Sequence, residues 1–186
     1  MLTPQTSEAT VLFCDLSGFT ALSEELGARM TIKVLNAYFS EAVTVLEQHK
    51  GVVTQFQGDG ILAAFNLPLS NPDHAKEALS AAQEIVACVD RQQFFGRSLA
   101  VRIGISTGEV VAGAVGASGR LTYTVHGNAV NSAARIEALN KVTDTCILLS
   151  SSTACRISDV RLRSMGTFEI RGKSDVTELF SPTELA

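Results

Sequence analysis

The chain has 186 residues, of which 46% are hydrophobic, so it is long enough to bury a sizeable core within one domain. Its formal net charge is −4, which argues against a broad basic surface and therefore against a nucleic-acid partner. No apolar run reaches the roughly 18–20 residues that span a bilayer, so we expect no direct membrane insertion of this segment.

In chain order, the first predicted elements are a strand, a long helix and a hairpin. Residues 9–13 form an apolar run typical of a short buried strand, and residues 30–49 carry apolar side chains at helical spacing. Residues 52–65 are predicted to form a β-hairpin with Asp59 and Gly60 as its turn, because an Asp-Gly pair supplies the positive φ that such turns need.

The rest of the chain mixes helices with short strands. Residues 99–105 alternate as a strand, with Arg102 pointing away from Val101 and Ile103, and the glycines between 104 and 119 are expected to loosen the following stretch. Helices are predicted at 73–89 and 128–139, and short strands at 121–125, 146–149, 160–162, 168–170 and 177–180. Helices mixed with hairpins favour an α+β sandwich over a doubly wound parallel sheet.

Two aspartates lie where a predicted strand runs into a loop that contains glycine. Asp15 follows the first strand, and Asp59 lies in the hairpin turn. Gly18 frees the backbone for close approach to a ligand, and Thr20 is the expected N-cap of a following helix, whose N-terminus would attract an anion. A single aspartate at such a place is more often a turn residue or a cap. Each one, taken alone, therefore has a structural explanation as well as a metal-binding one.

Five sequence blocks carry a resemblance to a known family. They read FCDLSGFT, QFQGDGILAAF, VRIGISTGEVVAG, YTVHGNAVNSAARIEAL and IRGKSDVTELF. In this order they resemble the class III adenylate/guanylate cyclase catalytic domain over about residues 9–180. The resemblance implies a ferredoxin-like βααβ core in a single catalytic domain that covers residues 1–186. It leaves open that this domain is excised from a larger receptor.

The resemblance also implies the metal-binding half of an active site. Asp15 and Asp59 would bind two divalent cations, Mg²⁺ or Mn²⁺, with the carbonyl of Leu16 as a further ligand. Arg102 would reach the polyphosphate of the substrate from the same protomer. The loop behind Asp15 would hold phosphate through Gly18, Phe19 and Thr20.

A second copy of the chain, in a head-to-tail homodimer, is implied to complete the site with Asn131, Arg135 and Lys173. The spacing agrees with this on physical grounds, because residues four apart on a helix project from one face. Asn131 can hydrogen-bond a ribose oxygen, and Arg135 offers a rigid fork of donors to a phosphate. The alternative for Arg135 is a surface salt bridge with Glu137 or Glu109, and for Lys173 a solvated loop lysine.

The implied reaction is the conversion of ATP to 3′,5′-cyclic AMP and pyrophosphate, which would make the chain an adenylate cyclase, a lyase of signal transduction. The ribose 3′-hydroxyl would attack the α-phosphate, flanked by the two cations. Positioning and charge stabilisation would account for most of the catalysis. No residue stands out as a general base.

Two positions choose the purine base, and both depart from the commonest family pattern. Gln55 stands where adenylate cyclases of this class usually have lysine, and Thr124 stands where many have aspartate. Gln55 can donate to adenine N1 while Thr124 accepts from N6, which favours ATP. Because both groups can also reverse their roles, a guanylate cyclase or an enzyme of dual specificity is the alternative.

Two other classes of protein compete with this interpretation. A catalytically inactive, nucleotide-binding regulatory module would be expected to lack one of Asp15, Asp59, Asn131 or Arg135, and all four are present. A diguanylate cyclase would need a GGDEF-type hairpin, where this chain reads Gln-Gly-Asp-Gly. The four cysteines lack metal-type spacing and are expected to be reduced thiols of a cytoplasmic protein, or of the cytoplasmic output domain of a membrane-anchored receptor.

Overall fold

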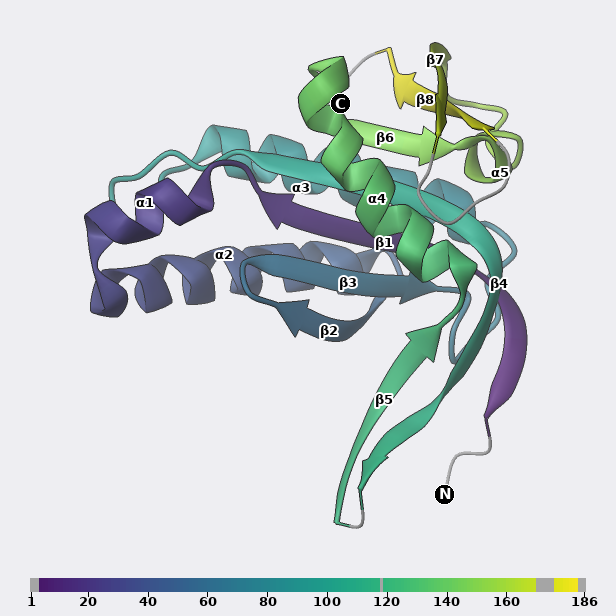
Figure 1. The fold of residues 1–186 in the computed structure, drawn as a ribbon, viewed down its shortest axis with the longest axis horizontal. Helices are drawn as coiled ribbons and strands as arrows, with labels where there is room; N and C mark the ends of the chain where they lie inside the picture. Colours follow the sequence, from purple (N-terminus) through teal and green to yellow (C-terminus); the bar gives the residue numbers. More distant parts are fainter. Residues whose placement is uncertain (1–3, 118, 170–175, 184–186) are drawn as a thin grey trace.

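An eight-stranded sheet organises the fold, with helices on both of its faces (Figure 1). The computed structural model describes residues 4–117, 119–169 and 176–183. The strands are β1 (Gln5–Leu16), β2 (Val52–Gln57), β3 (Gly60–Phe65), β4 (Val101–Ala117), β5 (Arg120–His126), β6 (Ile147–Ser150), β7 (Leu162–Glu169) and β8 (Val176–Pro182). The helices are α1 (Phe19–Leu26), α2 (Ala28–Gln48), α3 (His74–Arg91), α4 (Asn128–Thr143) and the single turn α5 (Ser151–Ala154).

The strand order explains how the two predicted aspartates come together. The strands run in the order β2-β3-β1-β4-β6-β8-β7, and β5 pairs with β4 outside this path. Strand β1 pairs antiparallel with both β3 and β4, while β4 pairs parallel with β6. Helices α1 and α2 connect β1 to β2, and α3 connects β3 to β4. The predicted α+β class with a ferredoxin-like core is confirmed.

Alternation along β1 directs its side chains into two layers. Leu12, Cys14 and Leu16 are almost completely buried in the large core, which α2 and α3 cover. Val11 packs on the opposite side of the sheet, in a second cluster that includes residues of α4. Because successive side chains of a strand alternate between faces, Asp15 belongs to the α4 side, at the point where β1 ends.

Helix α4 lies against β4 at unusually close range. A Cβ atom added to Gly104 would lie 2.2 Å from the carbonyl oxygen of Ala133 and 2.3 Å from the backbone nitrogen of Glu137. One turn further along α4, the Asn140 side chain donates to the Ile103 carbonyl over 3.0 Å. Glycine at position 104 permits this close approach, and the hydrogen bond from Asn140 holds α4 at a short distance from the start of β4.

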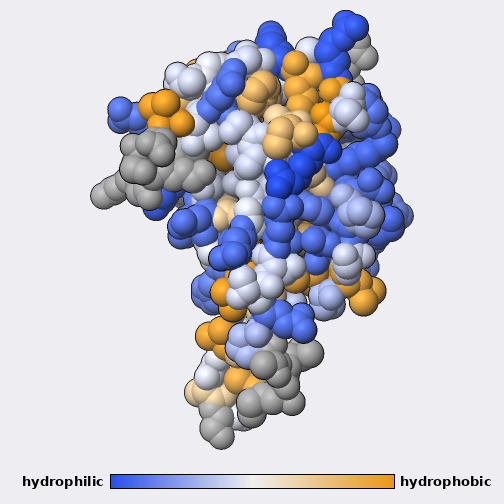
Figure 2. All heavy atoms as spheres, turned by 90° about the vertical axis from the view of Figure 1, so that its right-hand side faces the viewer, coloured by the Kyte–Doolittle hydropathy of each residue, from blue (hydrophilic) through white to orange (hydrophobic). Residues whose placement is uncertain are grey.

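The far ends of β4 and β5 form an arm that extends away from the body of the domain (Figure 1). Val111, Val115 and Leu121 on this arm are 43%, 53% and 53% exposed. Hydrophobic side chains are visible on the arm in the space-filling view (Figure 2). The arm therefore presents apolar surface that the described chain does not cover.

Three expectations about the strands and the turn between them are wrong. Strand β4 runs without a break from residue 101 to residue 117, because β1, β5 and β6 pair with it. The hairpin turn falls on Gly58 and Asp59, one residue earlier than expected, since Gly58 adopts the positive φ of +63°. Residues 160–161 lie outside any strand, and β7 begins at Leu162.

The structure also bears on the question of membrane insertion. No helix within the described ranges is both long and apolar enough to cross a bilayer.

Candidate active site

Asp15 and Arg102 are direct neighbours on adjacent strands. They are paired in the antiparallel register of β1 and β4 and share the face that α4 covers. Both side chains are partly buried. The predicted orientation of Arg102, opposite to the buried Val101 and Ile103, is confirmed by their burial. The metal-binding aspartate and the polyphosphate-binding arginine of the sequence prediction therefore come from one strand pair.

The β2–β3 turn brings Asp59 against Asp15. Gly60, which follows Asp59, approaches so closely that a Cβ there would lie 3.3 Å from Asp15 Oδ1 and 2.9 Å from Phe13 Cζ. Burial raises the pKa of Asp15 above its ordinary value, and the charge of Asp59 raises it further, whereas the Arg102 guanidinium lowers it. Two converging carboxylates of this kind are a donor set that suits a divalent cation.

A third carboxylate lies behind this pair, and the sequence analysis missed its role. Glu137 Oε1 lies 3.2 Å from Arg102 Nε, and the Glu137 side chain is only 7% exposed. The contact lacks hydrogen-bond geometry, so neither atom has a hydrogen-bond partner in the described chain. Burial raises the pKa of Glu137 to about 7, and the charge of Asp15 also raises it, while Arg102 lowers it.

The spacing of residues along α4 indicated that Glu137 does not share the exposed face of this helix. Glu137 is six residues after Asn131, which places the two side chains on different faces of α4. Glu137 was expected from sequence only as a surface partner of Arg135.

The loop after β1 differs in part from its prediction. Helix α1 begins at Phe19 and its N-cap is Gly18, in the left-handed conformation with φ +71°, so Thr20 lies in the first turn and is not the cap. The Phe19 side chain is 6% exposed and belongs to the large core. Gly18 and Thr20 are exposed beside the Asp15 end of β1. The side chain of Leu16 is buried in the core, so the group that this residue could offer to a cation is its backbone carbonyl.

The two positions predicted to select the base lie on the strands β2 and β5, which contact each other. A bulge between Val53 and Gln55 shifts the register so that Gln55 pairs with Leu62. Gln55 is exposed and accepts a hydrogen bond of 3.1 Å from Gln57 Nε2. Thr124 pairs with Gly113 and is partly exposed.

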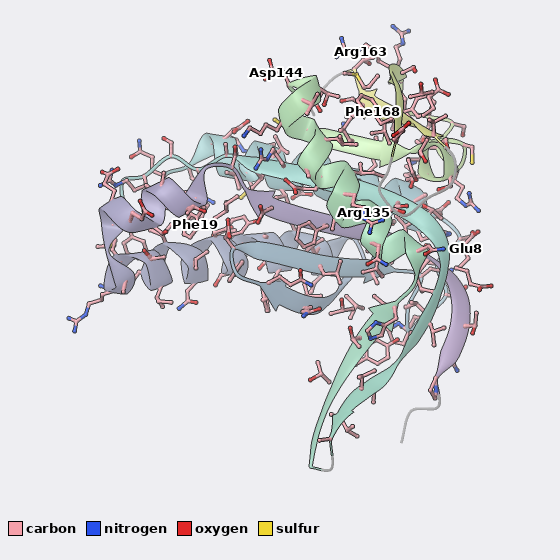
Figure 3. The ribbon with its side chains drawn as sticks, in the orientation of Figure 1. Glu8, Phe19, Arg135, Asp144, Arg163 and Phe168 are labelled. Atoms are coloured by element: carbon pink, nitrogen blue, oxygen red, sulfur yellow. The ribbon has the colours of Figure 1, made fainter. Side chains whose placement is uncertain are left out.

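Two of the remaining predicted residues, Asn131 and Arg135, lie on helix α4. Asn131 and Arg135 are both exposed on α4, and the described residues form no ion pair with Arg135, since Glu137 pairs with Arg102 instead. Arg135 and Phe19, which marks the start of α1, lie well apart in the side-chain view (Figure 3). Lys173 lies outside the described residues.

Comparisons with known proteins agree on one family. The family model described as "Adenylate and Guanylate cyclase catalytic domain" matches residues 1–181. Adenylate cyclase 1 of Rhizobium meliloti (strain 1021) is 34% identical over 179 residues, which cover 93% of this chain and 27% of that protein. The chain thus spans little more than a quarter of this curated relative's length.

Solved structures show the same likeness over the whole fold. The adenylyl cyclase CyaB from P. aeruginosa matches with a TM-score of 0.90 and 30% identity, over 98% of this chain and 97% of that one. The guanylyl cyclase Cya2 matches with a TM-score of 0.88 and 33% identity, over 100% of this chain and 96% of that one. Because an adenylyl and a guanylyl cyclase match about equally well, similarity alone does not select the base.

Proposed function

Because the chain belongs to the adenylate and guanylate cyclase catalytic domain family, we propose that it converts ATP to 3′,5′-cyclic AMP and pyrophosphate. In this reaction the ribose 3′-oxygen forms a bond to the α-phosphorus, and the bond from that phosphorus to the α,β-bridging oxygen breaks. The hydroxyl proton leaves to solvent or to a substrate oxygen. The observation that carries the proposal is the convergence of Asp15 and Asp59 beside Arg102 at one end of the sheet.

Asp15, Asp59 and the carbonyl of Leu16 are the groups proposed to hold two divalent cations, Mg²⁺ or Mn²⁺. The raised pKa of Asp15 supports this assignment, because it reflects two partly buried carboxylates whose mutual repulsion a cation would relieve. Bound cations would supply charge neutralisation at the α-phosphate and lower the pKa of the 3′-hydroxyl.

Residues around the aspartates are proposed to bind the polyphosphate. Arg102 offers guanidinium donors that suit phosphate oxygens. The exposed backbone at Gly18 and the first turn of α1, with Phe19 and Thr20, add the partial positive charge of a helix N-terminus. The Phe19 side chain anchors this turn in the core, so only its backbone is assigned to substrate binding.

A second copy of the chain, arranged head to tail, is proposed to complete each site. Asn131 would orient the ribose, and Arg135 would stabilise the charge that develops on the phosphate, with Lys173 beside it. Arg135 is exposed and forms no ion pair with the part of the chain that the structure describes, which supports a role outside its own chain. The uncovered apolar side chains of the β4–β5 arm support an association between copies.

The preference for ATP rests on Gln55 and Thr124. Gln55 can donate to adenine N1, and Thr124 can accept from adenine N6. GTP is the alternative substrate, because both side chains can reverse their hydrogen-bonding roles. We propose that the reaction takes place in the cytoplasm, because the cysteine pattern is typical of reduced thiols in that compartment.

An assay of the purified domain with Mn²⁺ and either ATP or GTP tests this proposal. We expect cyclic AMP as the main product, and an activity per mole that rises with protein concentration as dimers form. A clear preference for GTP would move the assignment to a guanylate cyclase. Absence of any cyclic nucleotide at concentrations where the protein is dimeric would contradict the proposed reaction.

A further inference from the structure

Glu137 is a buried acidic side chain for which the proposed reaction has no use. Among the described residues, the charged side chain in direct contact with it is Arg102, at 3.2 Å from Nε to Oε1. Arg102 is itself 22% exposed, so its guanidinium lies between the buried carboxylate and the surface. Buried carboxylates are retained at a cost in desolvation, which calls for a reason beyond helix formation.

The backbone fixes the position of Glu137 from two sides. Because Gly104 has no side chain, the backbone of α4 at Glu137 can approach β4 closely, whereas a Cβ atom at position 104 would collide with it. Asn140 then ties the next turn of α4 to the Ile103 carbonyl, one residue from Arg102. The backbone that carries Glu137 is therefore fixed against β4, and its buried side chain offers a carboxylate that can order the longer and more flexible side chain of Arg102.

The contact with Glu137 involves only Nε of the Arg102 guanidinium. Glu137 faces Nε of Arg102, so the two terminal nitrogens of the planar group remain available to phosphate oxygens. A guanidinium held in this way loses less conformational freedom when it binds an anion.

We propose that Glu137 is a positioning residue, which holds the Arg102 guanidinium in the orientation that receives the polyphosphate of the nucleotide. This inference rests on the proposed function, in which Arg102 binds that polyphosphate. Helix α4 then serves both halves of the active site, since it also carries Asn131 and Arg135 on its exposed side.

Positioning and simple electrostatics predict opposite effects of removing the Glu137 charge. If Glu137 acts only as a negative charge near an anion site, its removal strengthens polyphosphate binding. If it positions Arg102, its removal weakens binding although the local charge becomes more favourable.

The test measures the binding of pyrophosphate in the presence of Mn²⁺ by isothermal titration calorimetry, together with kcat and KM for ATP. The variants are Glu137→Gln, which keeps an oxygen acceptor, and Glu137→Met, which removes it at similar length. We expect Glu137→Met to weaken pyrophosphate binding about tenfold, as for other partners that orient a ligand-binding group, and Glu137→Gln to lie between it and the natural chain. In an Arg102→Ala background, Glu137→Met should change the affinity by less than about twofold.

A matched control separates positioning from loss of packing. Ile136→Val perturbs the neighbouring, fully buried position of α4 without touching Arg102, so it should lower stability and leave pyrophosphate affinity unchanged. Unchanged or tighter pyrophosphate binding in Glu137→Met would overturn the inference, and so would a natural chain that does not bind pyrophosphate with Mn²⁺. A chain that binds pyrophosphate as expected but forms no cyclic nucleotide would refute the proposed reaction and leave the role of Glu137 standing.

Discussion

Asp15 of β1 lies directly across the antiparallel register from Arg102 of β4, so this strand pair presents a carboxylate and a guanidinium side by side. The same guanidinium lowers the pKa of two carboxyl groups, Asp15 and Glu137, and the charge of Asp59 raises both. Three carboxylates thus share one cation within the described chain. The excess of negative charge suits a site that works with bound divalent cations.

The substitution Asp15→Asn should uncouple stability from activity. Removing one of two repelling carboxylates should leave the melting temperature without divalent cations unchanged or higher, while activity falls by at least about 10²-fold. Mn²⁺ at about 100 times its Kd should stabilise the natural chain by about 2.7 kcal/mol and leave the variant almost unaffected. Thermal unfolding with and without Mn²⁺ measures both effects.

Glu24→Gln is the matched control, because Glu24 is exposed and forms no ion pair among the described residues. It removes one negative charge without touching the site, so it should keep both the activity and the stabilisation by Mn²⁺. Equal stabilisation of Asp15→Asn and the natural chain by Mn²⁺ would show that Asp15 is not a ligand.

Gly104→Ala should be among the most damaging single changes outside the charged groups. The added methyl would meet two backbone atoms of α4 at 2.2 and 2.3 Å, and backbone cannot move aside as a flexible side chain can. We expect a loss of about 3 kcal/mol in the free energy of unfolding, measured with urea. Gly108→Ala on the same strand is the control, since its methyl would lie 3.5 Å from the Ala129 Cβ, an ordinary contact.

The glycines of β4 also show where the sequence was misleading. Glycine is rare within strands, so a cluster of glycines between 104 and 119 indicated a loosened stretch. In the structure Gly104 marks the close approach of α4, and pairing to β1, β5 and β6 keeps the strand continuous. Such a role depends on a helix that follows much later in the chain, which local patterns do not reveal.

The proximity of the two aspartates proposed to bind metal was easier to predict from sequence than the contacts around them. Asp15 and Asp59 each stand at the end of a clear strand pattern, and antiparallel pairing of β1 with β3 brings them together. The contact of Arg102 with Glu137 needs the height and rotation of α4 over β4, which is a property of the packed fold. The N-cap was also missed, because the positive φ of Gly18 lets the helix begin two residues earlier than a cap at Thr20 would.

The stability of the cation-free chain should depend on pH through Glu137. An acid whose pKa is raised on folding binds more protons when folded, so the free energy of unfolding decreases as pH rises. For Glu137 the decrease should extend from its ordinary value of 4.5 to about 7 and then level off. Urea unfolding without divalent cations, from about pH 5 to 8, should show a smaller decrease in Glu137→Gln.

Part of this pH dependence should survive in Glu137→Gln, because the pKa of Asp15 is raised as well and acts in the same direction. The double variant with Asp15→Asn should therefore be flatter than either single one. A pH dependence identical in Glu137→Gln and the natural chain would contradict the assignment to Glu137.

Mixing two inactive variants should restore activity if two chains share each site. Asp15→Asn removes a proposed metal ligand, and Arg135→Ala removes a donor that the second copy is proposed to supply. In a symmetric dimer, random mixing of equal amounts gives half heterodimers, each with one intact site, so about a quarter of the natural activity should return. Asp15→Asn mixed with Asp59→Asn is the control, since both changes affect the same half-site and every mixed dimer remains defective.

Gln55→Glu should shift the preference from ATP toward GTP. A carboxylate accepts charge-assisted hydrogen bonds from the N1–H and amino group of guanine, whereas it faces an acceptor at N1 of adenine. With about 1.5–3 kcal/mol for a hydrogen bond to a charged group, the ratio of kcat/KM for GTP over ATP should rise at least about tenfold. Gln48→Glu makes the same change at an exposed position of α2 that no described hydrogen bond links to Gln55, so it should leave the ratio unchanged. If Gln55→Glu left the ratio unchanged, base selection would have to be assigned to residues other than Gln55.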